Sequence, residues 1–346
     1  ILLKYRCFLK LLHWTLFVDL LGYRDINGDV DNLEKAKELI EFMKSNVELF
    51  KNQNDSIKLR EQYSQSNFDI FSHYDISFAF ISDSLIVSYT PNLESDFPEH
   101  IALSHSANML LIILQRLISL IYKCVLEKKI FLRGGISNHY SYIDGTFAVG
   151  KGVGAAYLAE SKKAIYPRVV LADDVVENTK LMKAISWLSN LMYETDLIVD
   201  DNGTRYLDFN RFGVVTLDAR SQNKFVIQNA ITDPEAYKES IFHQGGILKV
   251  YKEAIEFQIN KALEIKESMD PEEQKLYKSL REKYIWLSNY HNNSCEHFSK
   301  LIIAIPKPVA YSNPKTLEIV KILLETIPAI VAFKIDSNLL DSLKKV

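Results

Sequence analysis

Hydrophobic residues near the start of the chain form first a strand-like run and then a helical pattern. The apolar, aromatic run Trp14–Leu20 ends at Leu21-Gly22, which predicts a strand followed by a glycine turn. From Val30 to Phe50, apolar residues recur at helical spacing among charged ones, which predicts an amphipathic helix. The polar stretch from Lys51 to Asn67 predicts a loop or insertion. The chain therefore opens as strand, helix and loop.

The middle of the chain alternates strands and helices. Two β-prone runs between Asp75 and Thr90 flank Asp83-Ser84, which is typical of a hairpin with an acidic tip. A long helix with an apolar face is predicted from His100 to Leu126. The elements predicted after it are a strand at Lys129–Ser137, a turn at Asp144-Gly145, a helix at Ala155–Ala164, a strand at Tyr166–Ala172, a helix beginning near Val175 with Asp173-Asp174 as its cap, and a hairpin at Leu197–Phe209 around Asn202-Gly203.

Beyond about Phe212 the pattern becomes helical. Helices are predicted at Pro234–Lys266, Pro271–Asn292 and Lys315–Glu325. Strands separated by helices predict an α/β (α+β) fold with helices packed on a sheet. We expect an α/β domain over residues 1–215 and a mainly helical C-terminal region over residues 216–346.

Composition and charge narrow the class of protein. The chain has 346 residues, of which 47% are hydrophobic and 25% charged, the balance of a globular protein with a sizeable core. The formal net charge is -3 and no polybasic segment occurs, which argues against duplex nucleic acid as the main partner. Cys7, Cys124 and Cys295 are widely spaced and predict reduced, buried thiols in a cytoplasmic protein. Basic residues interrupt the apolar start of the chain, so no membrane association is expected.

Two aspartates carry the candidate chemistry. Asp19 ends an apolar strand, where an unpaired carboxylate is costly to bury, and Asp83 lies at the tip of the predicted hairpin. If that hairpin lies beside the first strand, the two carboxylates converge at one edge of the sheet. Carboxylate oxygens are ligands that Mg²⁺ prefers, so the pair predicts a metal site. The alternatives without a metal are that Asp19 is a strand-end carboxylate that caps the following turn and that Asp83 is an ordinary turn residue.

Several segments resemble class III nucleotidyl cyclases. Phe17–Tyr23 resembles the first metal motif of that family, F-x-D-I-x-G-F, and Phe80–Ser84 resembles its second metal hairpin, with Ser82 where the family usually has Gly. Leu132–Ile136 is similar to the R-x-G-I strand, and Gly150–Ser161 matches in length the helix G-D-x-x-N-x-A-x-R-L-E-S. The resemblance covers roughly Trp14 to Ala172. The further segments Ala164–Arg168, Lys283–Leu287 and Tyr290–Asn292 resemble bacterial relatives of the cyclases, a superfamily that includes pyrimidine cyclases of anti-phage defence.

The resemblance implies a ferredoxin-like, palm-type sheet, a nucleoside triphosphate substrate and a homodimer with each site formed across the interface. It implies two Mg²⁺ or Mn²⁺ ions held by Asp19, Asp83 and the backbone carbonyl of Leu20, which activate the ribose 3′-OH and support the departing pyrophosphate. The residues that it assigns to nucleotide binding are Leu20, Leu21, Gly22, Tyr23, Ala79, Phe147, Gly150 and Lys151.

The chain departs from the family at the positions that read the base and stabilise the transition state. Ala79 and Phe147 stand at the two purine-reading positions, and neither side chain can form the hydrogen bonds that separate adenine from guanine. A pyrimidine triphosphate is therefore the next candidate. Gly154 and Leu158 stand at the catalytic Asn and Arg positions. A degenerate domain that binds nucleotide and regulates a partner is thus an alternative, and an interaction module with structural aspartates is a third.

Candidate replacements for the missing cation are, in order of preference, Arg24, Lys151, Arg168 and Arg133. Arg168 is equally compatible with a buried partner for a carboxylate and with a phosphate ligand. The glycine run Gly150–Gly154 opens a helix and could cradle phosphate, although close helix packing is the stronger interpretation.

Overall fold

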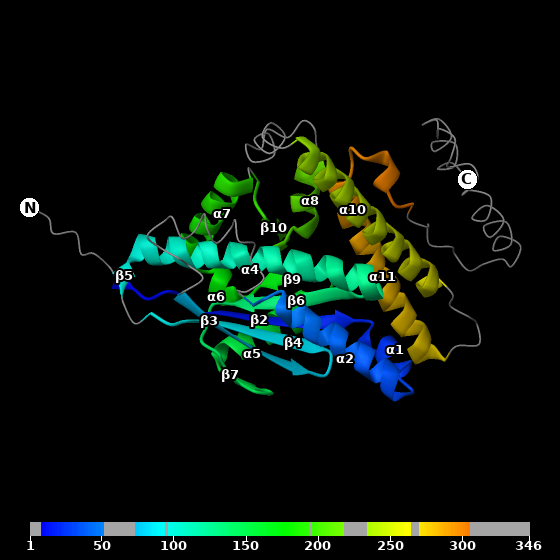
Figure 1. Ribbon diagram of the computed structural model, residues 1–346, viewed down its shortest axis with the longest axis horizontal. Coiled ribbons are helices and arrows are strands. Elements are labelled where there is room, and N and C mark those ends of the chain that lie inside the picture. Colours follow the sequence, from blue (N-terminus) through cyan, green and yellow to red (C-terminus); the bar gives the residue numbers. More distant parts are fainter. Residues whose placement is uncertain are drawn as a thin grey trace, which may run out of the picture. The chain divides into compact units, whose positions relative to one another are not determined.

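A computed structural model of the chain describes residues 8–51, 73–93, 96–193, 195–217, 234–263 and 270–304 (Figure 1). The chain divides into two compact units, Ile1–Ile303 and Ala304–Val346, and all the helices and strands named below belong to the first. The helix predicted at Lys315–Glu325, Cys7 and nearly all of the loop predicted at 51–67 lie outside the described residues.

A seven-stranded mixed sheet forms the centre of the first unit. Its order is β10-β11-β9-β6-β2-β4-β3, and every neighbouring pair is antiparallel except β6 and β9, which run parallel. The strands are β2 Trp14–Leu21, β3 Tyr74–Ile81, β4 Ser84–Pro91, β6 Phe131–Ser137, β9 Val169–Leu171, β10 Ile198–Asp201 and β11 Thr204–Leu207. Two small antiparallel ribbons complete the β-structure: β1 Phe8–Leu9 with β5 Phe97–Pro98, and β7 Tyr142–Asp144 with β8 Phe147–Val149.

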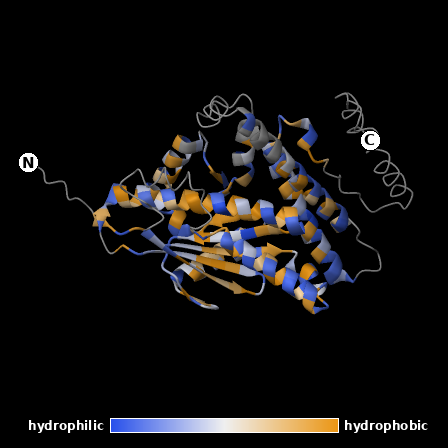
Figure 2. Cartoon of the chain, in the orientation of Figure 1, coloured by the Kyte–Doolittle hydropathy of each residue, from blue (hydrophilic) through white to orange (hydrophobic). Residues whose placement is uncertain are grey.

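Helices alternate with these strands. They are α1 Tyr23–Gly28, α2 Leu33–Glu48, α4 Glu99–Lys128, α5 Lys151–Lys163, α6 Asp173–Val176, α7 Thr179–Tyr193, α8 Phe209–Leu217, α10 Pro234–Leu263, α11 Pro271–Ser294 and the 3-10 turn η3 Ser299–Leu301. From β2 to β6 the order is β-α-β-β-α-β, as predicted, and the mixed sheet with its helices confirms an α+β fold. Figure 2 shows hydrophobic stretches in the strands of the sheet, and the central strands β2, β4, β6 and β9 consist mostly of buried residues.

Helix α4 is the central helix of the core. By length and composition it could cross a membrane, with a mean hydropathy of 2.0 over 18 residues. However, 78% of that window is buried inside the fold, because the helix packs against the sheet on one side and α7 and α10 on the other. The apolar character of α4 is thus that of a core helix, and the cytoplasmic location stays a prediction.

Three predicted boundaries need correction. Helix α5 begins at Lys151 instead of Ala155, because Gly150, with φ 117°, supplies the break before it. Strand β9 is shorter than the predicted Tyr166–Ala172, since the Arg168 N–H donates to the Tyr166 carbonyl and Pro167 has no N–H to donate. The side chain of Asp174 does not cap α6, whose N-cap is Ala172 and makes no side-chain capping bond.

The C-terminal helices pack on the same core as the sheet. Tyr251 of α10 is buried between the rings of Tyr122 on α4 and Phe131 on β6, at centroid distances of 6.0 and 5.6 Å. Cys124 and Cys295 are free and buried, as predicted, and burial raises the pKa of both thiols to about 12. The division into residues 1–215 and 216–346 stays a prediction.

Candidate functional site

Asp19 and Asp83 meet at one end of the sheet. Asp19 is near the end of β2, where it pairs with Ser84 of β4 on one side and with Arg133 of β6 on the other. Asp83 belongs to the two-residue turn between β3 and β4, and its carbonyl accepts a hydrogen bond from the Leu20 N–H at 3.1 Å. The strand and the hairpin turn therefore lie side by side, as the sequence predicted.

The two carboxylates also interact through their side chains. Burial is the largest influence on Asp19, whose side chain is 13% exposed, and it raises the pKa of this group. The hydrogen bond and charge of Arg133 lower that pKa, whereas the charge of Asp83 and a hydrogen bond with its side chain raise it. Two carboxylates in contact repel each other when both are ionised, so this arrangement favours a cation between them.

Arg133 joins Asp19 to a third carboxylate, Glu160 of α5. Its Nε lies 2.8 Å from Asp19 Oδ2 and 2.6 Å from Glu160 Oε1. Burial raises the pKa of Glu160, Arg133 lowers it, and Asp19 and Asp83 raise it further. Glu160 was not predicted as a site residue, although it occupies the E of the pattern G-D-x-x-N-x-A-x-R-L-E-S.

Close packing of α5 on β6 makes the Arg133–Glu160 contact possible. A Cβ atom on Gly135 would lie 2.1 Å from the Ala156 carbonyl oxygen and 2.9 Å from the Glu160 nitrogen. Only glycine allows the helix backbone to come this near the strand. The second glycine of the Arg133-Gly134-Gly135-Ile136 motif is therefore what brings Glu160 to the site.

The residues after Asp19 build the rim of the site. Leu20 is buried, Leu21 and Tyr23 are half-buried, and Gly22 begins α1 in the left-handed conformation at φ 92°. Leu20 donates its N–H toward the hairpin, and because the N–H and C=O of one residue in an antiparallel strand point to the same side, its carbonyl faces Asp83 as well. Arg24 is exposed in the first turn of α1 and forms no ion pair with any residue in the described part of the chain.

The structure does not bring Gly150 and Lys151 to Asp19 within one chain. A Cβ atom on Gly150 would lie 2.6 Å from the Tyr140 carbonyl oxygen, and one on Gly152 would lie 2.3 Å from that of His139. The glycine run thus packs against the loop 138–141, in line with the stronger of its two interpretations. Helix α5 leads from this loop to Glu160, and its 13 residues span about 20 Å.

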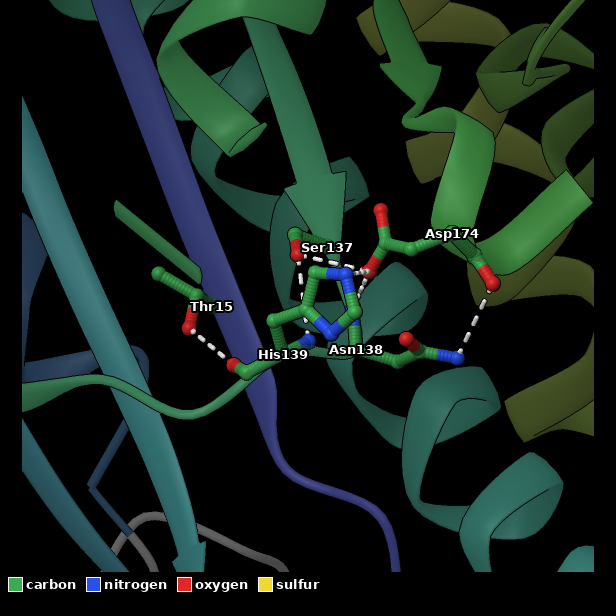
Figure 3. Close-up of polar contacts among 5 residues, drawn as sticks. All are labelled: Thr15, Ser137, Asn138, His139 and Asp174. Atoms are coloured by element: carbon green, nitrogen blue, oxygen red, sulfur yellow. Dashed lines mark hydrogen bonds and ion pairs between the residues drawn. The ribbon is translucent and has the colours of Figure 1, made fainter. Parts of the chain in front are cut away.

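A polar cluster fixes the loop that the glycines contact (Figure 3). Asp174 Oδ2 accepts hydrogen bonds from the Ser137 hydroxyl at 2.7 Å and from the Asn138 N–H at 2.6 Å. The Thr15 hydroxyl donates to the His139 carbonyl at 3.1 Å. Thr15 precedes Asp19 by four residues on β2, so this cluster lies about 13 Å along the strand from the aspartates.

The two positions matched to purine readers lie in different surroundings. Ala79 is 2% exposed and packs with Ile86 and Ile143, so the expectation that it contacts a nucleotide is not supported by its position. Phe147 on β8 is 77% exposed. Of the two, only Phe147 presents a side chain to an open surface.

Arg168 is a buried partner for a carboxylate and is not open to a phosphate. It is 4% exposed, and its Nη1 donates to Asp201 Oδ2 at 2.8 Å. The guanidinium carbon lies 5.0 to 5.4 Å from the ring centroids of Tyr166, Tyr206 and Trp286. The catalytic assignment of Arg168 is corrected accordingly, because three rings and a carboxylate already surround the cation.

Comparison with solved structures gives a weak likeness. No family model matches the chain, and no curated protein matches it. Among solved structures, the crystal structure of the guanylyl cyclase Cya2 aligns with 13% sequence identity and a TM-score of 0.25, covering 56% of this chain and 89% of that chain. At this score the likeness carries no argument about activity, which must come from the geometry of the site.

The donor set suits a divalent cation that keeps other ligands. Among the residues that the structure describes, no group of three or more His, Cys, Asp or Glu side chains could hold a metal ion. Asp19, Asp83 and the Leu20 carbonyl would therefore supply only part of a coordination shell. Mg²⁺ is usually bound in this way, through one or two carboxylates together with water and substrate phosphates.

Proposed function

We propose that the protein is a metal-dependent nucleotidyl cyclase, which converts a nucleoside triphosphate to a 3′,5′-cyclic nucleotide and pyrophosphate. The observation that carries this proposal is the meeting of Asp19 and Asp83 at the end of β2, where the Leu20 N–H donates to the Asp83 carbonyl and the charge of Asp83 raises the pKa of the largely buried Asp19. The β-α-β-β-α-β order from β2 to β6 is also the order of a ferredoxin-like, palm-type sheet.

The residues at this end of the sheet have distinct tasks in the proposed reaction. Asp19, Asp83 and the Leu20 carbonyl would hold two Mg²⁺ or Mn²⁺ ions, which would supply activation of the 3′-hydroxyl and charge neutralisation. The 3′-oxygen forms a bond to the α-phosphorus and loses its proton to solvent, while the bond from this phosphorus to the bridging oxygen breaks and pyrophosphate leaves. Arg133 holds Asp19 Oδ2 and thereby fixes the orientation of that carboxylate.

The base is not read as in purine cyclases. Ala79 is buried among apolar side chains, and Phe147 offers only a ring. Neither can distinguish adenine from guanine by hydrogen bonds, so a pyrimidine triphosphate is the preferred candidate substrate.

A homodimer would complete the site. Large apolar side chains are exposed on the β7–β8 ribbon and on α5, namely Tyr142, Phe147, Val149, Tyr157 and Leu158. Such a group of exposed apolar residues marks a contact surface. Within one chain, Gly150 and Lys151 lie away from Asp19 and Asp83. A second copy bound at this surface could bring its own Gly150 and Lys151 toward these aspartates.

Turnover of the four nucleoside triphosphates with Mn²⁺ tests the proposal. We expect one of them to give a cyclic nucleotide and pyrophosphate, separable by chromatography. Asp19→Ala and Asp83→Ala should abolish the product without loss of fold, whereas the exposed control Asp96→Asn should retain it. Absence of cyclic product from all four would refute the enzymatic function.

A degenerate domain that binds nucleotide without turnover is the second candidate. It is favoured by Gly154 and Leu158, which are exposed on α5 and offer no polar side chain where the family has Asn and Arg. Tight triphosphate binding that depends on Asp19, together with no product, would select it.

A further inference from the structure

Helix α11 brings the C-terminal region to the end of the sheet that carries Asp19. The ring of Tyr284 packs against Phe131 at a centroid distance of 5.6 Å, and the ring of Trp286 stacks on Tyr166 at 4.9 Å. Phe131 is the first residue of β6 and is two residues from Arg133, so both side chains leave the strand on the same face. Lys283 precedes Tyr284 on the same turn of α11, near enough to Arg133, Asp19 and Glu160 for their charges to influence it.

Lys283 lies near the carboxylate cluster but forms no ion pair with it among the described residues. Lys283 is half-buried, and burial and the Arg133 cation lower its pKa while the Asp19 and Glu160 carboxylates raise it. Arg133 is already committed to those two carboxylates at 2.8 and 2.6 Å. Lys283, in contrast, has no carboxylate within 4 Å among the described residues, so its desolvation is not offset by a close partner.

We propose that Lys283 is a substrate-binding cation of the Asp19–Asp83 site and contacts the pyrophosphate portion of the triphosphate. This inference rests on the proposed function and gives α11 a part in it. An ammonium on a flexible stem serves as a point charge for phosphate, and an arriving phosphate supplies the anion that Lys283 lacks. A cation from α11 would also balance the charge that develops on the departing pyrophosphate.

Binding of pyrophosphate in the presence of Mn²⁺, measured by titration calorimetry, tests this proposal without knowledge of the base. We expect Lys283→Met to bind pyrophosphate at least tenfold more weakly than the unaltered protein, and Lys283→Arg to recover most of the loss. Mn²⁺ binding alone should not weaken in Lys283→Met, since the metal contacts Asp19 and Asp83. Lys278→Met is the matched control, because Lys278 is exposed on the same helix and should change pyrophosphate affinity less than twofold.

The outcomes separate the two proposals. If Asp19→Ala loses Mn²⁺ and pyrophosphate binding but Lys283→Met stays within twofold of the unaltered protein, the role of Lys283 is refuted and the metal site stands. Equal weakening by Lys283→Met and Lys278→Met would likewise refute it, since the effect would then be that of general surface charge. If the unaltered protein binds neither Mn²⁺ nor pyrophosphate, both proposals fail.

Discussion

Ser82 adopts a backbone conformation that an L side chain enters only at a cost. Its φ of 58° lies in the left-handed region, in the tight turn that presents Asp83. Glycine would enter this conformation without strain, which the sequence alone does not show for position 82. The turn keeps its shape here because β3 and β4 pair along their whole lengths.

Ser82→Gly should stabilise the protein. Glycine enters the left-handed region without strain, although its unfolded state is more flexible, so we expect a gain of up to about 1 kcal/mol in the free energy of unfolding. Urea denaturation measures it. Ser84→Gly in the same hairpin is the control and should cost about 0.5–1 kcal/mol, because Ser84 lies within β4. Equal destabilisation by both changes would show that the backbone at Ser82 is not strained.

At the residue scale, the sequence predicted part of the site. Asp19 and Asp83 could be selected because each is an acidic residue beside an apolar β-prone run. Glu160 and Lys283 were not selected, since both lie on helices where a charged residue is ordinary, and only the family pattern marked Glu160. The packing of α5 on β6 brings Glu160 into contact with Arg133, and the contact of α11 with β6 brings Lys283 near enough for the cluster to influence its charge. Arg168 was selected but belongs to no such site. Its partner Asp201 lies on a separate hairpin, so the sequence alone could not reveal this pairing.

At the scale of elements, the contact between α5 and β6 determines where Glu160 lies. That contact depends on a backbone approach at Gly135 that no side chain could tolerate. The same helix contains Gly154, around which a Cβ atom would meet nothing within 4 Å. These two glycines therefore provide a test of the packing.

Gly135→Ala and Gly154→Ala should change stability in opposite directions. At Gly135 the added methyl group collides with the α5 backbone, and we expect a loss of about 3 kcal/mol. At Gly154 alanine improves helix propensity without a clash, and we expect a gain of about 0.5–1 kcal/mol. Thermal unfolding followed by circular dichroism would measure both. A neutral Gly135→Ala would mean that α5 does not lie against β6 as described.

The periodicity of hydrophobic residues predicted the type of most elements but not the residues at which each begins and ends. The Asn202-Gly203 turn was recognisable because both residues favour positive φ, and they adopt 52° and 85°. The start of α5 was not, since glycine-rich sequence normally breaks helices. Here Gly152 lies inside the helix, and it is a glycine because the His139 carbonyl leaves no room for a side chain. Tertiary contacts thus decided the boundaries that the pattern could not.

At the scale of the whole molecule, α11 is joined to the segments around it through buried polar groups. The Tyr290 hydroxyl of α11 donates to Asp208 at 2.6 Å and accepts from the Asn210 N–H at 2.9 Å, which ties α11 to the start of α8. His291, the next residue, is fully buried and lies 2.9 Å from the Leu301 carbonyl through Nε2. The packing of α11 against the rest of the fold, and with it the position of Lys283, therefore depends on groups that must stay uncharged or paired.

Acidification should weaken the packing of α11, because it favours protonation of His291. Burial is the main cause that lowers the pKa of His291 from 6.5 to about 4, with the Lys252 charge adding to it and the Leu301 carbonyl opposing it. Between pH 6.5 and pH 4, His291 is protonated in the unfolded chain but neutral in the folded chain. The contribution of this group to the free energy of unfolding, which is fully present above pH 6.5, is therefore lost as the pH falls toward 4. Between pH 7 and pH 5 this single group should remove about 2 kcal/mol of unfolding free energy.

His291→Gln isolates this contribution, because glutamine can still donate to the Leu301 carbonyl but does not titrate. Denaturant unfolding at several pH values should show the unaltered protein losing about 2 kcal/mol more than the variant between pH 7 and pH 5. The difference between the two proteins is what matters, since Asp19, Glu160 and Asp208 have raised pKa values and oppose the effect in both. His297→Gln, at an exposed position, should follow the unaltered protein. Parallel pH profiles for all three proteins would mean that His291 is accessible to protons in the folded state, and that α11 is less firmly seated than its contacts indicate.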